Sequence, residues 1–162
     1  MQAFAADSGV WGVSRGALEV SSTSPHTDAV AVYDLGDSTG LPAYFEVEAK
    51  FKSMKPTSGW DANSHIIFDY ENPTSFKFAG VNVSTNKLEI GHRDATGWVV
   101  DIQTPFQAKA DTYYTMLLIV NGTAASLVVI NSAVLSKTYS VRVVDGYSYG
   151  LNWGLVGFGS NN

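Results

Sequence analysis

The strongest constraint on the fold is a two-residue alternation of apolar and polar side chains, which recurs between short clusters of turn-forming residues. In Tyr44–Lys52 (YFEVEAKFK) every second side chain from Phe45 onward is apolar, and the intervening ones are charged or carry a hydroxyl. This is the period of a half-buried β-strand. Further strands are predicted over residues 29–35, 65–70, 76–83, 87–93, 97–103, 114–120, 126–131 and 155–160.

The segments between these strands carry turn chemistry: DSTG, KPTSG, ENPTS, STNK, DATG and NGTA. Gly, Pro, Asn, Asp and Ser favour tight turns. No segment of ordinary helix length shows the apolar period of an amphipathic helix. About ten or more short strands with regular turns indicate an antiparallel sandwich or barrel.

Two hairpins are predicted. Strands 76–83 and 87–93 flank a tip at Ser84–Asn86, and Asn121–Thr123 turns the chain between two strongly apolar strands. Those two strands have little polar alternation, so we expect them to be covered on both faces or to lie at the centre of a sheet.

Composition narrows the function classes. The chain has 162 residues, 45% hydrophobic and 15% charged, with a net charge of −5, which suits one globular domain. Its ten basic residues are scattered, so neither nucleic acid nor an anionic membrane surface is an expected partner. No apolar run approaches the roughly 20 residues of a membrane helix, and the N-terminal segment lacks the features of a signal peptide. The absence of cysteine excludes disulfides, thiolate metal sites and cysteine nucleophiles.

Four short motifs follow one another in the centre of the chain: Phe68-Asp69-Tyr70, Lys77-Phe78-Ala79-Gly80, Gly91-His92-Arg93 and Gly97-Trp98. Together they resemble the concanavalin A-like lectin/glucanase superfamily, specifically the LamG-like domains of bacterial RTX-type adhesins and extracellular proteins. The flanks, W-x-V-x-x-G-x-L at Trp11–Leu18 and GLVGFGS at Gly154–Ser160, are compatible with it.

The resemblance implies an antiparallel jelly-roll sandwich of two packed sheets, one concave and one convex, spanning residues 1–162 as a single domain excised from a larger protein. Such domains lay their first and last strands side by side, and here those strands are expected to be incomplete. Glycans, peptides or proteins bind the concave face or one loop edge in this superfamily, and calcium is common near that edge. An extracellular or bacterial cell-surface location is implied, with neighbouring domains of the same protein as partners.

Some members of the superfamily are retaining glucanases with an E-x-D-x-x-E strand. Glu46 and Glu48 share one face of their predicted strand, but the third position is Phe51. Retaining glycosidases need two carboxylates about 5 Å apart in a cleft, whereas this face also carries Tyr44 and Lys50 and is expected to be solvated. No HExxH, GxSxG or phosphate-loop motif occurs. A Ser–His–Asp triad has no specific support, so we expect no enzymatic activity.

The alternation in residues 65–70 places Phe68 and Tyr70 on one face and His65 and Asp69 on the other. Asp69 has two interpretations. In the functional one it lies beside His65 and accepts hydrogen bonds from a ligand, or ligates calcium from a loop.

In the structural interpretation Asp69 pairs with Lys77 or with Arg93 and holds neighbouring strands in register. We favour this one because a buried carboxylate needs a cationic partner. Arg93 is itself more plausible as a salt-bridge partner than as a ligand contact, and His92 as a core or sheet-interface histidine. Gly91 removes a side chain from the face of Arg93 and leaves room for a ligand or a large neighbour.

Among the tryptophans, Trp60 lies in the polar segment SGWDANS and is the best candidate for an aromatic platform at a binding edge. Trp98 precedes two valines, so core packing is at least as plausible for it as ligand contact. Trp11 and Trp153 are expected to cap the core near the chain ends.

For calcium, the sequence offers two oxygen-rich loops, whose candidate ligands are Asp34, Asp37, Asp61 and Asn63. Calcium takes six to eight oxygens, and neither loop matches an EF-hand or the RTX nonapeptide. Ordinary use of Asp and Asn in turns is therefore preferred.

The sequence thus predicts a non-catalytic extracellular recognition module of an adhesin-type protein. It would bind a glycan or peptide, with calcium as a candidate cofactor, through Trp60, His65, Arg93 and Trp98. The alternatives are a structural spacer that carries a neighbouring binding domain and a divergent glycoside-active enzyme.

Overall fold

The fold is built from antiparallel strands, as the alternation predicts. The computed structural model describes residues 4–21, 24–25, 27–34, 41–54, 56–130, 133–139, 142–144, 147–152 and 154–161, and within these ranges it contains no helix. The strands are β1 (Ala5–Ser8), β2 (Val10–Ser14), β3 (Ala17–Ser21), β4 (Asp28–Tyr33), β5 (Tyr44–Lys52), β6 (Asn63–Asn72), β7 (Ser75–Asn82), β8 (Lys87–Asp94), β9 (Gly97–Pro105), β10 (Tyr113–Asn121), β11 (Ala124–Val129), β12 (Ala133–Thr138), β13 (Arg142–Val144), β14 (Tyr147–Tyr149) and β15 (Leu155–Asn161). The predicted fold class, an all-β antiparallel sandwich, is confirmed. Among these residues no helix is long and apolar enough to span a bilayer.

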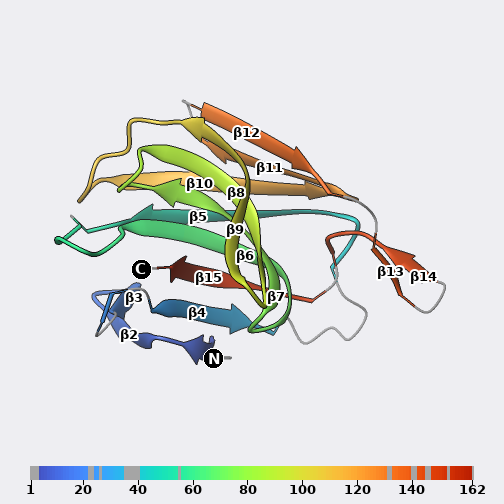
Figure 1. Ribbon diagram of the computed structural model, residues 1–162, viewed down its shortest axis with the longest axis horizontal. Helices are drawn as coiled ribbons and strands as arrows, with labels where there is room; N and C mark the ends of the chain where they lie inside the picture. Colours follow the sequence, from blue (N-terminus) through green and yellow to red (C-terminus); the bar gives the residue numbers. More distant parts are fainter. Residues whose placement is uncertain are drawn as a thin grey trace.

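Two sheets form the sandwich (Figure 1). One has seven strands in the order β1-β4-β15-β6-β7-β8-β9, and the other has four in the order β12-β11-β10-β5. Two smaller two-stranded sheets, β2–β3 and β13–β14, lie outside them.

Both predicted hairpins are present. β7 and β8 pair up to Asn82 and Lys87, and β10 and β11 pair up to Asn121 and Ala124. Gly122 adopts the left-handed conformation that the second turn requires, with φ of 60°. β10 lies between β5 and β11 in its sheet, which accounts for its weak polar alternation.

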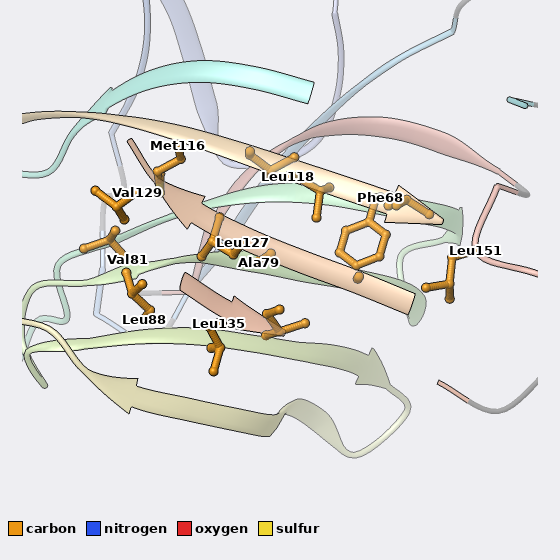
Figure 2. Close-up of a cluster of buried hydrophobic side chains, with 14 of the residues drawn as sticks. Phe68, Ala79, Val81, Leu88, Met116, Leu118, Leu127, Val129, Leu135 and Leu151 are labelled. Atoms are coloured by element: carbon orange, nitrogen blue, oxygen red, sulfur yellow. The ribbon is translucent and has the colours of Figure 1, made fainter. Parts of the chain in front are cut away.

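The core lies between the two large sheets (Figure 2). It consists of inward-facing side chains of both sheets together with Ala62, Val83 and Leu151 from the segments that adjoin the strands. The sheet residues are Phe45, Ile66, Phe68, Ala79, Val81, Leu88, Ile90, Met116, Leu118, Val120, Ala125, Leu127, Val129 and Leu135. Alternate residues of β5, β10 and β11 in one sheet and of β6, β7 and β8 in the other point into this space, as the two-residue period of the sequence predicts.

A second cluster covers the opposite face of the seven-stranded sheet, which we call the curled face. Its buried members are Val30, Val32, Ile67, Tyr70, Phe76 and Phe78, with Trp98 and Leu155 packed against them. These residues come from strands at both ends of the sheet order, so the sheet curls until β4 approaches β8 and β9. The concave surface is thereby filled by the protein's own side chains.

Glycines on the curled face permit this curvature. A Cβ on Gly80 would lie 2.7 Å from His65 Cδ2, and one on Gly91 would lie 2.5 Å from Phe78 Cζ. Real Cβ atoms essentially never approach other atoms so closely. The space that Gly91 leaves on the face of Arg93 is therefore occupied by a large neighbour, the Phe78 ring.

A β-bulge at Asp69 corrects one feature of the predicted alternation. Asp69 has a φ of 50°, and the β6–β7 register shifts between Phe68 and Asn72. The extra residue turns the following side chains over. Tyr70 consequently joins Ile67 on the curled face rather than Phe68 in the sandwich core.

The first and last described strands are not neighbours, and the expectation that the terminal strands typical of the family are incomplete here stays a prediction. β1 and β15 each pair with β4, which separates them, and β15 also pairs with β6. β15 is tied further to β6 through Asn63, whose amide donates to the carbonyl of Asn161 at 2.7 Å. The boundary of a single domain at residues 1–162 stays a prediction.

Candidate functional site

A cleft of about 840 Å³ opens where the hairpin β2–β3 approaches β5, residues 53–54 and 56–64, and the end of β15. We call it the edge cleft. Its aromatic lining consists of Trp11, Phe51, Trp60, Tyr113 and Phe158, and its charged lining of Glu19, Lys50, Lys52 and Asp61. In Figure 1 the hairpin β2–β3 lies beside the end of β15 that is marked C. Ligand clefts typically measure about 300–1,000 Å³ and combine apolar surface with a few polar groups.

The two tryptophans of the edge cleft are anchored by their local backbone. The indole nitrogen of Trp11 donates to the carbonyl of Ser8 at 2.7 Å, which fixes the ring on the small hairpin. The backbone amide of Trp60 donates to the carbonyl of Thr57 at 2.9 Å, in a turn where Gly59 has a φ of +82°. Both rings are half-buried, so each retains an accessible surface.

Aromatic contact also links the two large sheets beneath the cleft. Phe51 on β5 and Phe158 on β15 meet edge to face, with ring centroids 5.3 Å apart. Both line the edge cleft and pack against the core. The apolar part of the lining is therefore held by the same packing that joins the sheets.

One wall of the edge cleft carries two cations around an aromatic ring. The ammonium groups of Lys50 and Lys52 lie 4.9 and 5.4 Å from the ring centroid of Tyr113. Contacts of this length fall within the range of cation–π attraction. Glu19 and Asp61 supply exposed carboxylates to the same cleft, so hydrogen-bond donors and acceptors are both available.

Of the four residues predicted to bind ligand, only Trp60 lines the edge cleft. His65, Arg93 and Trp98 lie on the curled face. His65 is fully buried, its Nε2 lies 2.8 Å from a Glu89 carboxylate oxygen, and its ring is 5.5 Å from that of Trp98.

Trp98 packs into the aromatic cluster of the curled face. Its ring centroid lies 5.1 Å from that of Phe76 and 4.8 Å from that of Phe78. The backbone of Trp98 pairs with that of Arg93, across β8 and β9. These contacts match the packing role that the sequence offered as the alternative for Trp98.

Arg93 closes the curled face. Its Nε lies 3.4 Å from the carboxylate of Asp28 on β4, and its guanidinium also donates to the carbonyl of Asp94. His92 points to the other face, where its Nδ1 lies 3.0 Å from a carboxylate oxygen of Asp101. Both residues therefore engage partners within the protein.

Asp69 pairs with Lys77, one of the two partners that the sequence predicted, at 3.2 Å between Nζ and Oδ2. Asp69 is 1% exposed. Burial lowers the pKa of Lys77, an effect opposed by the carboxylates of Glu71 and Asp101. The ammonium also lies 5.2 Å from the ring centroid of Tyr139, which packs against the core.

The predicted calcium ligands are not gathered into one site in the described structure. Asn63 Oδ1 already accepts hydrogen bonds from Ser160 Oγ at 2.8 Å and from the Asn161 amide at 3.0 Å. Asp61 is exposed in the edge cleft, Asp34 follows the end of β4, and Asp37 lies outside the described residues. Over the described ranges, no three His, Asp or Glu side chains are grouped so that they could hold a metal ion. Asn63 in its present position does not fit a calcium site.

Glu46 and Glu48 project from the exposed side of β5, and neither lines the edge cleft. The Tyr44 hydroxyl donates to the Glu46 carboxylate, an interaction that raises the pKa of Tyr44. Both glutamates thus lie on a solvated face of β5, as expected from the sequence.

Trp11 is the cleft residue that the sequence placed elsewhere. It was expected to cap the core, but it lies on the hairpin β2–β3 and lines the edge cleft. Trp153, for which the same role was expected, lies outside the described residues. The alternation rule could not locate Trp11 because β2 and β3 bury no complete face.

No family model matches the chain, and no curated protein matches it. A search of solved structures finds the carbohydrate-binding module CBM66 from Bacillus subtilis. The match has a TM-score of 0.76 and 12% sequence identity, and it covers 99% of this chain and 88% of that module. At this identity the likeness establishes a shared jelly-roll fold.

Proposed function

We propose that this protein is a non-catalytic glycan-recognition module and that the edge cleft is its binding site. The observation that carries the proposal is the pair of anchored, half-buried tryptophans, Trp11 and Trp60, in one cleft of ligand-binding size. Indole rings present a flat apolar surface on which the C–H face of a sugar can stack. The carbohydrate-binding module with the same fold supports this function.

Recognition would combine stacking with hydrogen bonding. Trp11 lies on the hairpin β2–β3 and Trp60 lies in the segment before β6, so each of two separate elements supplies one indole ring to the cleft. Lys50, Lys52 and Asp61 would orient sugar hydroxyls, because a hydroxyl both donates and accepts hydrogen bonds. Binding in such an open cleft is expected to be shallow and of modest affinity.

As part of this proposal we place the module in the extracellular part of a bacterial adhesin-type protein, of the LamG-like kind that the central motifs resemble. Its glycan would then lie on a cell surface or in a matrix. Calcium assistance stays a proposal of the sequence, and among the predicted ligands that the structure describes, Asp61 and Asn63 line the edge cleft. Thermal melting in calcium and then in chelator tests it, and an unchanged midpoint would remove calcium from the account.

Binding on a glycan array, followed by titration calorimetry with the retained oligosaccharide, tests the proposed function. Trp60→Ala and Trp11→Ala should each abolish or strongly weaken binding without lowering the melting temperature. Tyr44→Ala is a matched control, because Tyr44 is 53% exposed and lies outside the edge cleft.

Three outcomes would contradict the proposal. Failure to bind any glycan would favour the spacer, and binding to a peptide array alone would place the protein in a different recognition class. Release of reducing sugar from a β-glucan that is lost in Glu46→Gln would show an enzyme.

A further inference from the structure

The four-stranded sheet has an outer face, opposite the core, on which a row of aliphatic side chains lies among hydroxyl-bearing and charged ones. Its rows follow from the strand register: Glu48, Leu117, Val128 and Val134 form one row across β5, β10, β11 and β12. Ile119 lies in the adjacent row with Glu46, Ser126 and Ser136. Val134 is 63% exposed, and Leu117, Val128 and Ile119 are half-buried rather than buried. Only Val134 among these four is exposed, so the charges beside the row decide what could cover it.

Charged side chains occupy one edge of the outer face in two blocks. Along β5 the outward-facing residues are Glu46 and Glu48 followed by Lys50 and Lys52, and all four are exposed. Ala49, between the blocks, points inward with the core side chains of its strand. The strand thus carries an acidic half and a basic half on the same face.

This arrangement is complementary to itself. Consider a two-fold axis that lies between two copies, parallel to their sheets and perpendicular to β5 at Ala49. It places β5 of the second copy antiparallel over β5 of the first, with the two outer faces in contact. Glu46 then faces Lys52 of the second copy, and Glu48 faces Lys50. Because the axis is two-fold, the same four residues make each pair twice.

The apolar rows meet under the same operation. Leu117 lies beside Glu48 and Thr115 beside Lys50 in the strand register, so the row of Leu117 comes over the row of Thr115. Ile130, whose amide donates to the Thr115 carbonyl and which is 37% exposed, extends that second row. Leu117 then faces Thr115 of the second copy and Val128 faces Ile130, with the charge pairs along one side.

We propose that the outer face of the four-stranded sheet binds a second copy of this chain, forming a two-fold symmetric dimer by sheet-to-sheet packing. Two sheets packed face to face in this way lie about 10 Å apart, which long Glu and Lys side chains can bridge. Each carboxylate accepts several hydrogen bonds, so the bond from Tyr44 to Glu46 does not prevent the new pair.

The expected strength follows from the size of the face. Four strands about 4.8 Å apart and up to nine residues long present roughly 500 Å² per copy, or about 1,000 Å² in a dimer. This total lies at the lower limit of specific interfaces. The dimer should therefore be reversible and concentration-dependent.

Sedimentation velocity over a concentration series tests the proposal with two charge-exchange variants. Glu46→Lys/Glu48→Lys leaves lysine at all four outward positions, and Lys50→Glu/Lys52→Glu leaves glutamate at all four. Each variant alone should be monomeric, because like charges then face one another. An equimolar mixture should restore a dimer that contains one copy of each.

A neutral variant probes the apolar part. Ile130→Asn should weaken dimerisation about tenfold or more, because Ile130 faces Val128 of the second copy and the loss occurs in both copies. Circular dichroism melts verify that every variant is folded. A wild-type chain that stays monomeric at all concentrations, or a charge-exchange variant that dimerises as the wild type does, would overturn the proposal.

The proposed dimer and the proposed glycan site share Lys50 and Lys52, so the acidic pair, Glu46 and Glu48, is used to separate the two proposals. Glu46→Lys/Glu48→Lys lies outside the edge cleft, so its monomer should still bind glycan. Loss of the dimer with glycan binding intact, or the converse, separates the two proposals.

Discussion

Arg93 on β8 lies 3.4 Å from the carboxylate of Asp28 on β4, although β15, β6 and β7 separate these two strands in the sheet. The contact spans the concavity of the seven-stranded sheet rather than a neighbouring pair of strands. It is possible only because the sheet curls, and it lies over a cluster that includes Val30 and Phe78.

We expect the Asp28–Arg93 pair to stabilise the curl only slightly. Asp28 is 35% exposed at its side chain and Arg93 is 17% exposed, and partly exposed ion pairs contribute about 0.2–1 kcal/mol. A double-mutant cycle of Asp28→Asn and Arg93→Gln, measured by urea denaturation, should give a coupling energy in this range that shrinks in salt. Zero coupling at low salt would show that the contact has no energetic role.

The Lys77–Asp69 pair should matter far more, because it is buried. Lys77→Met leaves the Asp69 carboxylate without this cation and should cost about 3 kcal/mol of unfolding free energy. Adding Asp69→Asn should recover much of that loss, since asparagine tolerates the positive φ of 50° and carries no charge. Lys52→Met, on an exposed surface, serves as the control. A cost below about 1 kcal/mol for Lys77→Met would contradict the assignment.

Gly91→Ala should be strongly destabilising. Its Cβ would meet Val99 O at 2.1 Å and the Phe78 ring at 2.5 Å, whereas a Cβ on Gly12 would meet nothing within 4 Å. Forcing such an overlap costs about 1–3 kcal/mol or more. Chemical denaturation should therefore show a loss for Gly91→Ala and little change for Gly12→Ala. Equal effects would show that the close approach to Phe78 does not limit this position.

Alkaline pH should weaken the fold through Tyr70. Burial, with a smaller effect from Asp7, raises the pKa of Tyr70 from its ordinary 10.0 to about 12. A raised pKa in the folded state means that the stabilisation is complete below pH 10 and is lost as pH rises towards 12. Between these values the unfolding free energy should fall by up to about 1.4 kcal/mol per pH unit for this group. Denaturation curves of Tyr70→Phe should decline less steeply than those of the wild type, and identical slopes would contradict the assignment.

Trp60 and Trp98 should respond oppositely to truncation. Trp98→Ala removes a ring packed against Phe76, Phe78 and His65 and should cost about 3–5 kcal/mol. Trp60→Ala should leave the melting temperature nearly unchanged and reduce glycan binding instead. Calorimetric scans measure the melting temperature of both variants, and titrations measure their glycan binding. An equal loss of melting temperature in the two variants would refute the contrast.

The sequence predicted the strands that contribute a full face to the core. The alternation of Tyr44–Lys52 reappears in β5 because Phe45 and Phe51 both pack against core residues. The hairpin at Asn121–Thr123 was recognisable from its turn chemistry alone. These elements depend on local pattern, which a single sequence records.

The remaining features depend on contacts between distant segments. The bulge at Asp69 exists where β6 must pair with both β7 and β15, and its effect on Tyr70 could not be read from the alternation. On the curled face, His65 lies against Glu89 of β8 and Arg93 lies against Asp28 of β4. Neither side chain therefore lies on an open surface. Trp11 reached the edge cleft through a hairpin that lacks any two-residue alternation with a buried face.

The position of β15 has a consequence for how the chain folds during synthesis. β15 follows every other described strand in sequence, yet it lies between β4 and β6 and pairs with both. The meander β6-β7-β8-β9 can pair as it leaves the ribosome, whereas β4 has no neighbour on that side until β15 emerges. We therefore expect that β1 and β4 cannot join the meander through most of translation. The seven-stranded sheet would then be completed in one late step, when β15 pairs with β4 on one side and with β6 on the other.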